Sequence, residues 1–311
     1  MRYIFGPVPS RRLGISLGLD IIPYKTCSLD CLYCECGRTT LRTCQRQRFF
    51  EPESILAELR ETLATIPHLD FISFSGSGEP TLNSDLGFLI GEIKKTAPYR
   101  VAVLTNGTLL HLPEVRRDLS AADVVLPSLD AATPAGFQRI NQPGGELGID
   151  QIIDGLVTFR REYGGKIWLE VFFLEGINTA DAELDALYAA VKRIGPDRVQ
   201  LNTLDRPPAY PGVQAPSLSF LEEVRGKWND LPVEIIKRIR QRQEISAFNR
   251  DLERSILDTI RRRPLTLEDL TAVTGMTGQQ LFPYIDILEK ENRIRPAIVG
   301  RNIFYESVAR K

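Results

Sequence analysis

The sequence predicts an α/β protein, a (β/α)6 arrangement of parallel strands followed by a small second domain. Short apolar runs alternate with helical stretches between residues 17 and 206, and this alternation indicates parallel strands joined by right-handed crossovers. About six such units can be counted, fewer than the eight of a closed barrel. Beyond residue 212 the pattern changes to short helices and a hairpin, which predicts a separate domain.

The expected strands are short apolar runs, and the first leads into a cysteine-rich loop. Pro52 lies in the first turn of the first expected helix, which has apolar residues at helical spacing. The strands span residues 17–22, 71–74, 101–104, 124–126, 167–173 and 198–201, and the later helices span residues 85–96, 113–121, 150–162 and 181–194. In such folds the chemistry collects at the carboxyl ends of the strands.

Four of the five cysteines stand within ten positions. Cys27, Cys31 and Cys34 have the spacing C-x3-C-x2-C, which lets three thiolates converge on one iron-sulfur cluster. Three ligands leave one iron of a four-iron cluster open to a reactive ligand. Structural zinc is the alternative, with Cys36 or Cys44 as a fourth ligand, although structural zinc sites more often carry two separated pairs. Cys36 and Cys44 are too few to hold a second cluster.

The composition is that of an ordinary globular protein, with 311 residues, 43% hydrophobic and 25% charged residues and a net charge of −1. No apolar run is long enough to span a bilayer, and the amino terminus lacks the apolar run of a signal peptide. A cytoplasmic location without disulfides is therefore expected. His68 and His111 lie in no ligand spacing, which argues against histidine as the main acid-base catalyst.

Polar residues follow each expected strand. After the second strand stands the loop Ser75-Gly76-Ser77-Gly78-Glu79-Pro80-Thr81. Its glycines let the backbone approach a ligand, and Glu79 can accept a hydrogen bond from an ammonium group. The interpretation as a phosphate-binding loop is rejected because no Gly-Lys-Ser/Thr follows, whereas a plain turn stays possible. The later strands end in Thr105-Asn106-Gly107, Ser128-Leu129-Asp130 and Leu201-Asn202-Thr203-Leu204, and Glu170 holds an inward position.

The stretch Cys27-x3-Cys31-x-Tyr33-Cys34 resembles the C-x3-C-x-aromatic-C signature of the radical S-adenosylmethionine (SAM) superfamily. The resemblance implies that the three cysteines bind a 4Fe-4S cluster and that the amino acid part of SAM chelates the fourth iron. An electron from the cluster would then give methionine and a 5'-deoxyadenosyl radical that abstracts hydrogen from the substrate. It further implies an open, TIM-like barrel core over residues 17–206 and an electron donor such as flavodoxin or ferredoxin.

The same resemblance assigns SAM-binding residues. The glycine-rich loop looks like the family's Gly-Gly-Glu motif, with Ser77 where the family often has glycine. Thr105 and Asn106 would lie near the ribose and the carboxylate, and Leu201 and Leu204 would supply apolar contact beside the adenine. The full set is Tyr33, Gly76, Ser77, Gly78, Glu79, Thr105, Asn106, Ser128, Asp130, Glu170, Leu201, Asn202 and Leu204.

Three parts of the chain are expected. Residues 1–212 would form the barrel, since three prolines in five positions from Pro207 end its pattern. Residues 213–245 would be a connecting helix and strand, ending in basic residues from Lys237 to Arg242. Residues 246–311 predict three helices and a hairpin, with capping signals at Thr266 and Thr277. This order resembles a winged helix-turn-helix.

The third helix of this last segment, over residues 277–290, takes the recognition position. Its face would carry Gln279, Gln280, Tyr284 and Lys290, and phosphate contacts would come from residues 261–263 and Arg301. Several acidic residues dilute this charge, so peptide binding or simple packing are alternatives of nearly equal weight.

The amino-terminal stretch Phe5-Gly6-Pro7-Val8-Pro9-Ser10-Arg11-Arg12-Leu13-Gly14 resembles the wyosine-synthase-like branch of iron-sulfur oxidoreductases. With a basic lip of Arg38, Arg42, Arg46 and Arg48 after the cysteines, it favours an RNA substrate, above all tRNA. Modification of a peptide or protein is the alternative. A non-catalytic iron-sulfur sensor that binds DNA is a hypothesis of another class, but it leaves Glu79, Asn106 and Asn202 without a task. The oligomeric state stays open.

Overall fold

A computed structural model describes residues 3–10, 12–64, 66, 69–204, 208–236, 250–299 and 302–308. These residues form a large eight-stranded sheet, a three-stranded sheet, a two-stranded ribbon and the helices around them. Several residues singled out in the sequence lie outside the described residues, namely Arg11, His68, Arg206, Pro207, Arg301 and the basic residues from Lys237 to Arg242.

The large sheet is the partial barrel, and its strand order is β1-β2-β5-β6-β7-β8-β9-β10. Neighbours from β2 to β10 run parallel, whereas β1 runs antiparallel to β2. In the described part of the chain no pairing joins β1 to β10, so the barrel is open. The strands are β1 (Ile4–Ser10), β2 (Gly14–Leu19), β5 (Phe71–Phe74), β6 (Arg100–Thr105), β7 (Val124–Pro127), β8 (Lys166–Phe173), β9 (Arg198–Thr203) and β10 (Val233–Ile235).

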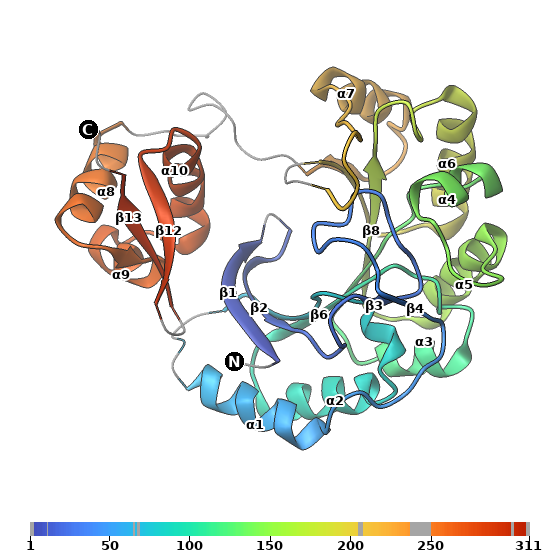
Figure 1. Ribbon diagram of the computed structural model, residues 1–311, viewed down its shortest axis with the longest axis horizontal. Coiled ribbons are helices and arrows are strands. Elements are labelled where there is room, and N and C mark those ends of the chain that lie inside the picture. Colours follow the sequence, from blue (N-terminus) through green and yellow to red (C-terminus); the bar gives the residue numbers. More distant parts are fainter. Residues whose placement is uncertain are drawn as a thin grey trace.

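Helices cover the outside of the curved sheet, as Figure 1 shows. They are α1 (Pro52–Leu63), α2 (Leu86–Thr96), α3 (Pro113–Leu119), α4 (Pro134–Ile140), α5 (Ile149–Glu162), α6 (Asp181–Ile194) and α7 (Leu218–Lys227). Three of them, α1, α3 and α4, begin with proline, which presets the first helical turn. With β2, β5, β6, β7, β8 and β9 as its strands, the expected partial barrel of six units is confirmed. No described helix has the length and apolar character needed to cross a bilayer.

The two faces of the sheet have different contents. Alternate strand residues such as Leu17, Ile72 and Leu169 pack against the helices in the main core. The opposite face forms a smaller apolar cluster that includes Phe71, Leu126 and Trp168 and is joined by Leu13 from the turn between β1 and β2. Apolar side chains thus fill the amino end of the barrel, and the polar groups gather at the carboxyl ends of the strands.

Two strands extend the sheet beyond the expected six units. β1 pairs with β2 in a hairpin, and β2 begins three residues earlier than expected. At the other edge β10 pairs with β9, and Leu221, Val224 and Trp228 of the α7 region belong to the main core. The segment expected to be a connector therefore contributes a strand and a helix to the barrel.

The carboxyl-terminal segment folds around its own apolar core. It comprises α8 (Arg250–Arg262), β11 (Leu265–Thr266), α9 (Leu267–Thr274), α10 (Gly278–Lys290), β12 (Ile294–Val299) and β13 (Asn302–Ser307). Both expected capping boxes are present, Thr266 with Asp269 and Thr277 with Gln280. The segment lies against the β1–β2 side of the barrel, and α10 contacts both strands (Figure 1).

The four side chains expected on the recognition face of α10 all have contacts within the protein, but only Tyr284 is buried. Tyr284 is 3% exposed and belongs to the core of the segment. Gln280 accepts the Thr277 backbone N–H in the capping box, and Lys290 pairs with Asp286. Helix α10 packs so closely on the hairpin that a Cβ on Gly14 would lie 2.7 Å from the amide nitrogen of Gln279. Tyr284 is therefore corrected from the recognition face to the core, whereas Gln279, Gln280 and Lys290 are exposed.

Candidate active site

The cysteine loop runs between β2 and α1, includes the short strands β3 (Thr26–Cys27) and β4 (Leu41–Arg42), and is tied to the glycine-rich loop. The Glu79 N–H donates to the Thr26 carbonyl (3.1 Å), and the Lys25 N–H donates to the Ser77 carbonyl (3.1 Å). All five cysteines are free. The loop therefore holds three thiols beside the carboxyl ends of the strands.

Each of the three motif sulfurs receives a hydrogen bond from a nitrogen of a different residue. Lys25 Nζ donates to Cys34 Sγ (3.0 Å), Asn106 Nδ2 to Cys27 Sγ (3.4 Å) and Asn141 Nδ2 to Cys31 Sγ (3.4 Å). These donors come from the loop itself, the end of β6 and the end of α4. Three separate elements thus fix the positions of the three sulfurs.

The three thiols differ in their electrostatic surroundings. Hydrogen bonding with the Cys36 thiol, supported by Lys25, lowers the pKa of Cys34 to about 5. Burial, with the nearby carboxylate of Glu79, raises the pKa of Cys27 to about 12. Burial also holds the pKa of Cys31 well above its usual value. Without a metal, only Cys34 favours the thiolate at neutral pH, so binding at the other two would release protons.

Glu79 is the centre of a buried network at the ends of β5 and β6. Its Oε1 accepts from Thr81 N (3.0 Å), Thr81 Oγ1 (2.6 Å) and Thr105 Oγ1 (2.6 Å), and its Oε2 accepts from Asn106 N (2.7 Å). Four donors match the acceptor capacity of a carboxylate. A ligand ammonium would therefore have to replace one of the two hydroxyls, which can rotate away. Burial raises the pKa of Glu79.

Ser77, where the family often has glycine, has a partner of its own. Asp20 Oδ2 accepts both the Ser77 backbone N–H (3.0 Å) and the Ser77 hydroxyl (2.6 Å). Gly76 has φ 148°, and a Cβ there would lie 2.4 Å from Asp20 Cγ. The serine is thus accommodated by an aspartate at the end of β2, and the loop keeps its glycine where the backbone requires it.

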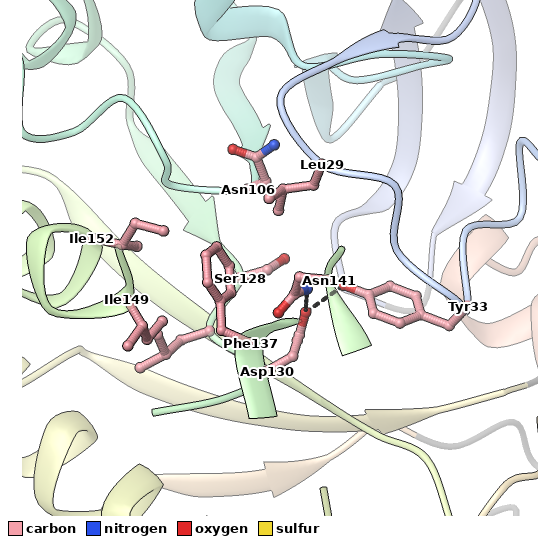
Figure 2. A pocket seen from close by; sticks show the side chains of 10 residues that line it. Leu29, Tyr33, Asn106, Ser128, Asp130, Phe137, Asn141, Ile149 and Ile152 are labelled. Carbon is pink, nitrogen blue, oxygen red and sulfur yellow. Dashed lines mark hydrogen bonds between the residues drawn. The ribbon is translucent and has the colours of Figure 1, made fainter. Parts of the chain in front are cut away.

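A small cavity lies between the cysteine loop, the ends of β6 and β7, and helices α4 and α5. Figure 2 shows Asp130 at its edge, where Tyr33 Oη (2.5 Å) and Asn141 Nδ2 (2.7 Å) donate to Asp130 Oδ2. Phe172 N also donates to Asp130 Oδ1 (3.0 Å), and the Tyr33 ring stacks on Phe172. Burial raises the pKa of Asp130 to about 6. Asp130 therefore anchors the cysteine loop to β7 and β8. The cavity lining is Leu29, Tyr33, Asn106, Ser128, Leu129, Asp130, Phe137, Asn141, Ile149 and Ile152.

Glu170 and Asn202 lie side by side on β8 and β9. Asn202 Nδ2 donates to Glu170 Oε1 (3.0 Å), and Arg12, from the turn between β1 and β2, pairs with Glu170 Oε2. Leu204, just past β9, packs partly buried against the main core. The expected side-chain contact from Leu201 is corrected, because the alternation of β9 places it on the opposite face from Asn202, 0% exposed in the helix-facing core.

The expected basic lip splits into two pairs of arginines. Arg46 pairs with Asp118 and Arg48 with Asp85, so their charges are compensated. Arg38 and Arg42 are exposed and form no ion pair among the described residues. Arg38 stacks on the Tyr210 ring, with its guanidinium carbon 4.2 Å from the centroid, and Arg42 donates to the Gln142 carbonyl (3.1 Å). Among the described residues, Arg38 and Arg42 are thus the lip arginines without a direct ion pair.

The donor set fits a cluster better than a single metal ion. In the part of the chain that the structure describes, no three His, Cys, Asp or Glu side chains are close enough to share one ion. Tetrahedral zinc with bonds of about 2.3 Å would need such closeness. A four-iron cluster binds each thiolate through a different iron, so its sulfurs lie farther apart. The three thiols are free, and each is held by a separate hydrogen-bond donor, which leaves each of them available to a different iron.

Sequence reasoning missed four residues of this site. Asp20 and Lys25 flank the start of the cysteine loop, but the sequence does not show their directions. Arg12 was noted only within the amino-terminal resemblance. Asn141 stands 110 residues from Cys31 and carries no motif, so no sequence signal would have found it.

Comparison with known proteins was made on both sequence and structure. The Radical SAM superfamily profile matches residues 21–203. A protein named GTPase Obg from Brachyspira hyodysenteriae is 36% identical over 303 residues, 97% of this chain, but the chain spans only 45% of its length. A UPF0026 protein from Helicobacter pylori is 32% identical over 310 residues, 97% of this chain and 96% of that protein.

Two solved structures share the fold at low sequence identity. A radical SAM methyltransferase from Sphaerobacter thermophilus has a TM-score of 0.55 and 19% identity, covering 71% of this chain and 66% of that one. The structure of anSMEcpe with bound AdoMet has a TM-score of 0.52 and 17% identity, covering 84% of this chain and 67% of that one. At these identities the similarity concerns the fold alone.

Proposed function

Because this chain belongs to the radical SAM superfamily, as its match over residues 21–203 shows, we propose that it binds a 4Fe-4S cluster through Cys27, Cys31 and Cys34 and cleaves SAM reductively at that site. The observation that carries the proposal is the meeting of three free, hydrogen-bonded thiols with the buried carboxylate of Glu79 at the carboxyl ends of the strands. The chain is an enzyme of this superfamily.

When bound, the cluster and SAM supply an electron and a 5'-deoxyadenosyl radical that abstracts hydrogen from a substrate. The residues of the chain would position SAM and shield the radical from solvent. Glu79 would receive the amino group of SAM, and the ribose would meet Thr105 and, at the rim of the cavity, Ser128. Asn202 and Glu170 would bind the nucleoside end. The apolar cluster at the amino end of the barrel closes the site to water from below.

Anaerobic reconstitution with iron and sulfide tests this proposal. Wild-type protein given a reductant and SAM should release 5'-deoxyadenosine. Cys31→Ala should lose both the cluster absorbance and the product, whereas Cys44→Ala, which lies outside the motif, should keep both. Cofactor cleavage by Cys31→Ala would refute the ligand assignment. A loaded cluster without product would favour the non-catalytic sensor.

For the substrate we favour RNA, with tRNA first, and the exposed rim beside the cysteine loop supports this choice. Arg38 and Arg42 offer cationic groups to phosphates, and Tyr24, 70% exposed, offers a stacking surface to a base. The winged-helix assignment of the last segment, residues 246–311, stays part of the proposal. Since α10 packs on the barrel, this segment would support the rim rather than read bases.

The RNA proposal predicts a salt-dependent affinity that depends on the rim. Binding of bulk tRNA should weaken in Arg38→Gln/Arg42→Gln, with the slope of log affinity against log salt reduced by about 0.7 to 0.9 per lost phosphate contact. Arg117→Gln on α3, an exposed arginine elsewhere, should leave the slope unchanged. Equal slopes in both variants would instead direct the search to peptides. An electron donor such as flavodoxin or ferredoxin, and a cytoplasmic location suited to five free thiols, complete the proposal.

A further inference from the structure

Lys25 is a buried lysine whose ammonium contacts a cysteine sulfur. The residue is 2% exposed, and among the described residues its Nζ forms no ion pair with Asp or Glu. Its hydrogen-bond partner is Cys34 Sγ, at 3.0 Å. A buried charge is costly unless an opposite charge compensates it. Among the described residues, the direct contact of this ammonium is therefore with the sulfur site, whereas the Asp30 carboxylate acts on it from farther away.

The backbone holds this side chain in one direction. Lys25 has φ 57°, a left-handed conformation that residues other than glycine and asparagine seldom adopt. Its N–H donates to the Ser77 carbonyl (3.1 Å), and its carbonyl accepts from Thr40 N (3.0 Å) and Leu41 N (3.1 Å). Three backbone bonds thus fix an unfavourable conformation that aims the ammonium at the cysteine loop.

The other two sulfurs receive neutral donors. Asn106 serves Cys27 and Asn141 serves Cys31, each through a side-chain amide at 3.4 Å. Lys25 alone brings a full positive charge, at the shortest of the three distances. The surroundings of the three ligands are therefore asymmetric, with the charge placed beside Cys34. Charge and hydrogen bonds at the sulfurs are among the factors that set the potential of an iron-sulfur cluster.

We propose that Lys25 is a positioning residue that orients the Cys34 thiolate and makes the cluster bound there easier to reduce. The inference rests on the proposed function, since it requires a cluster on these three cysteines. An added electron increases the negative charge of the cluster, and a cation held 3.0 Å from a ligand sulfur stabilises that charge. The lysine thereby favours the reduced state that must donate the electron.

The test is the midpoint potential of the reconstituted cluster, followed by electron paramagnetic resonance in an anaerobic titration, together with iron content. Lys25→Gln keeps a hydrogen-bond donor and removes the charge, and Lys25→Arg keeps the charge. Lys94→Gln, which breaks a surface pair with Asp123, is the matched control. We expect Lys25→Gln to shift the reduction equilibrium at least tenfold toward the oxidised cluster, about 59 mV for one electron. Lys25→Arg and Lys94→Gln should stay near the wild type.

The possible outcomes distinguish the role of Lys25 from the proposed binding of a cluster. A fully loaded Lys25→Gln cluster at the wild-type potential would overturn the role of Lys25 and leave the cluster assignment standing. Wild-type protein that takes up no cluster would overturn both. If Lys25→Gln holds no iron, Lys25→Arg decides: a loaded cluster supports the need for a charge, and an empty site overturns it.

Discussion

Replacing Gly78 with alanine tests whether the glycine-rich loop and the cysteine loop must touch. A Cβ on Gly78 would lie 2.2 Å from the Thr26 carbonyl oxygen and 2.6 Å from Ile22 Cγ2, whereas unstrained contacts need about 3.5 Å. The two backbones would have to separate by more than ~1 Å, which breaks the Glu79 N–H to Thr26 O bond of 3.1 Å. The lost buried bond costs about 1–3 kcal/mol and the overpacking a further 1–3 kcal/mol or so. The free energy of unfolding should therefore fall by about 2–6 kcal/mol.

Gly91→Ala is the matched control, because a Cβ on Gly91 in α2 meets no heavy atom within 4 Å. Alanine there should stabilise the helix by roughly 0.8–1 kcal/mol. Anaerobic denaturant titrations measure both free energies of unfolding, and iron content after reconstitution reports on the cysteine loop. Gly78→Ala should lose stability and cluster uptake together. Wild-type values of both in Gly78→Ala would refute the reasoning that the two loops depend on each other.

Three further predictions concern the Asp130 anchor, the barrel ion pair and the α10 cap. Burial raises the pKa of Asp130 to about 6, so the stability that its protonation contributes is full below about pH 4 and is lost as the pH rises through 6, roughly 3 kcal/mol in all. Asp130→Asn should remove this pH-dependent loss, so the unfolding free energy of the variant minus that of the wild type should differ between pH 4.5 and pH 7.5. The same difference at both pH values would contradict this prediction. Arg12→Gln leaves Glu170 without its cation and should lower the free energy of unfolding by ~1–3 kcal/mol. In a double-mutant cycle, Arg12→Gln/Glu170→Gln should recover part of this loss. Additive losses of the two single variants would show that the two residues are not coupled. Thr277→Ala should cost about 1 kcal/mol by removing the N-cap of α10, whereas Thr277→Ser should cost little, as thermal melting can show.

The sequence predicts the parallel part of the sheet well because its strands are buried on both faces and read as continuous apolar runs. The same reasoning misses β1, which contains Gly6, Pro7 and Pro9. Proline and glycine normally argue against a strand, but an edge strand tolerates them because one side of its ladder is unpaired. The sequence also fails to predict helix α4, because its seven residues span barely two turns and show no clear hydrophobic period.

The site is predictable where a motif fixes it and unpredictable where tertiary contacts do. The spacing of the cysteines and the Glu79 loop locate the centre, and the two-residue period of β9 could have told Asn202 from Leu201. The hydrogen-bond donors to the sulfurs, in contrast, are set by tertiary contacts. The direction of Lys25 depends on a left-handed backbone, and Asn141 reaches Cys31 from the end of a helix. Neither fact is contained in local sequence.

The contacts also show why the proposed cluster ligands and the proposed SAM-binding residues form one unit. Asn106 donates its side-chain amide to Cys27 while its backbone N–H binds Glu79. Asn141 links Cys31 to Asp130 in the same way. A shift of either sulfur therefore moves a residue proposed to hold SAM, and a ligand on Glu79 acts back on Cys27 through one asparagine. Such shared partners couple neighbouring sites energetically, so occupancy by SAM and the geometry of the cluster ligands should respond to each other.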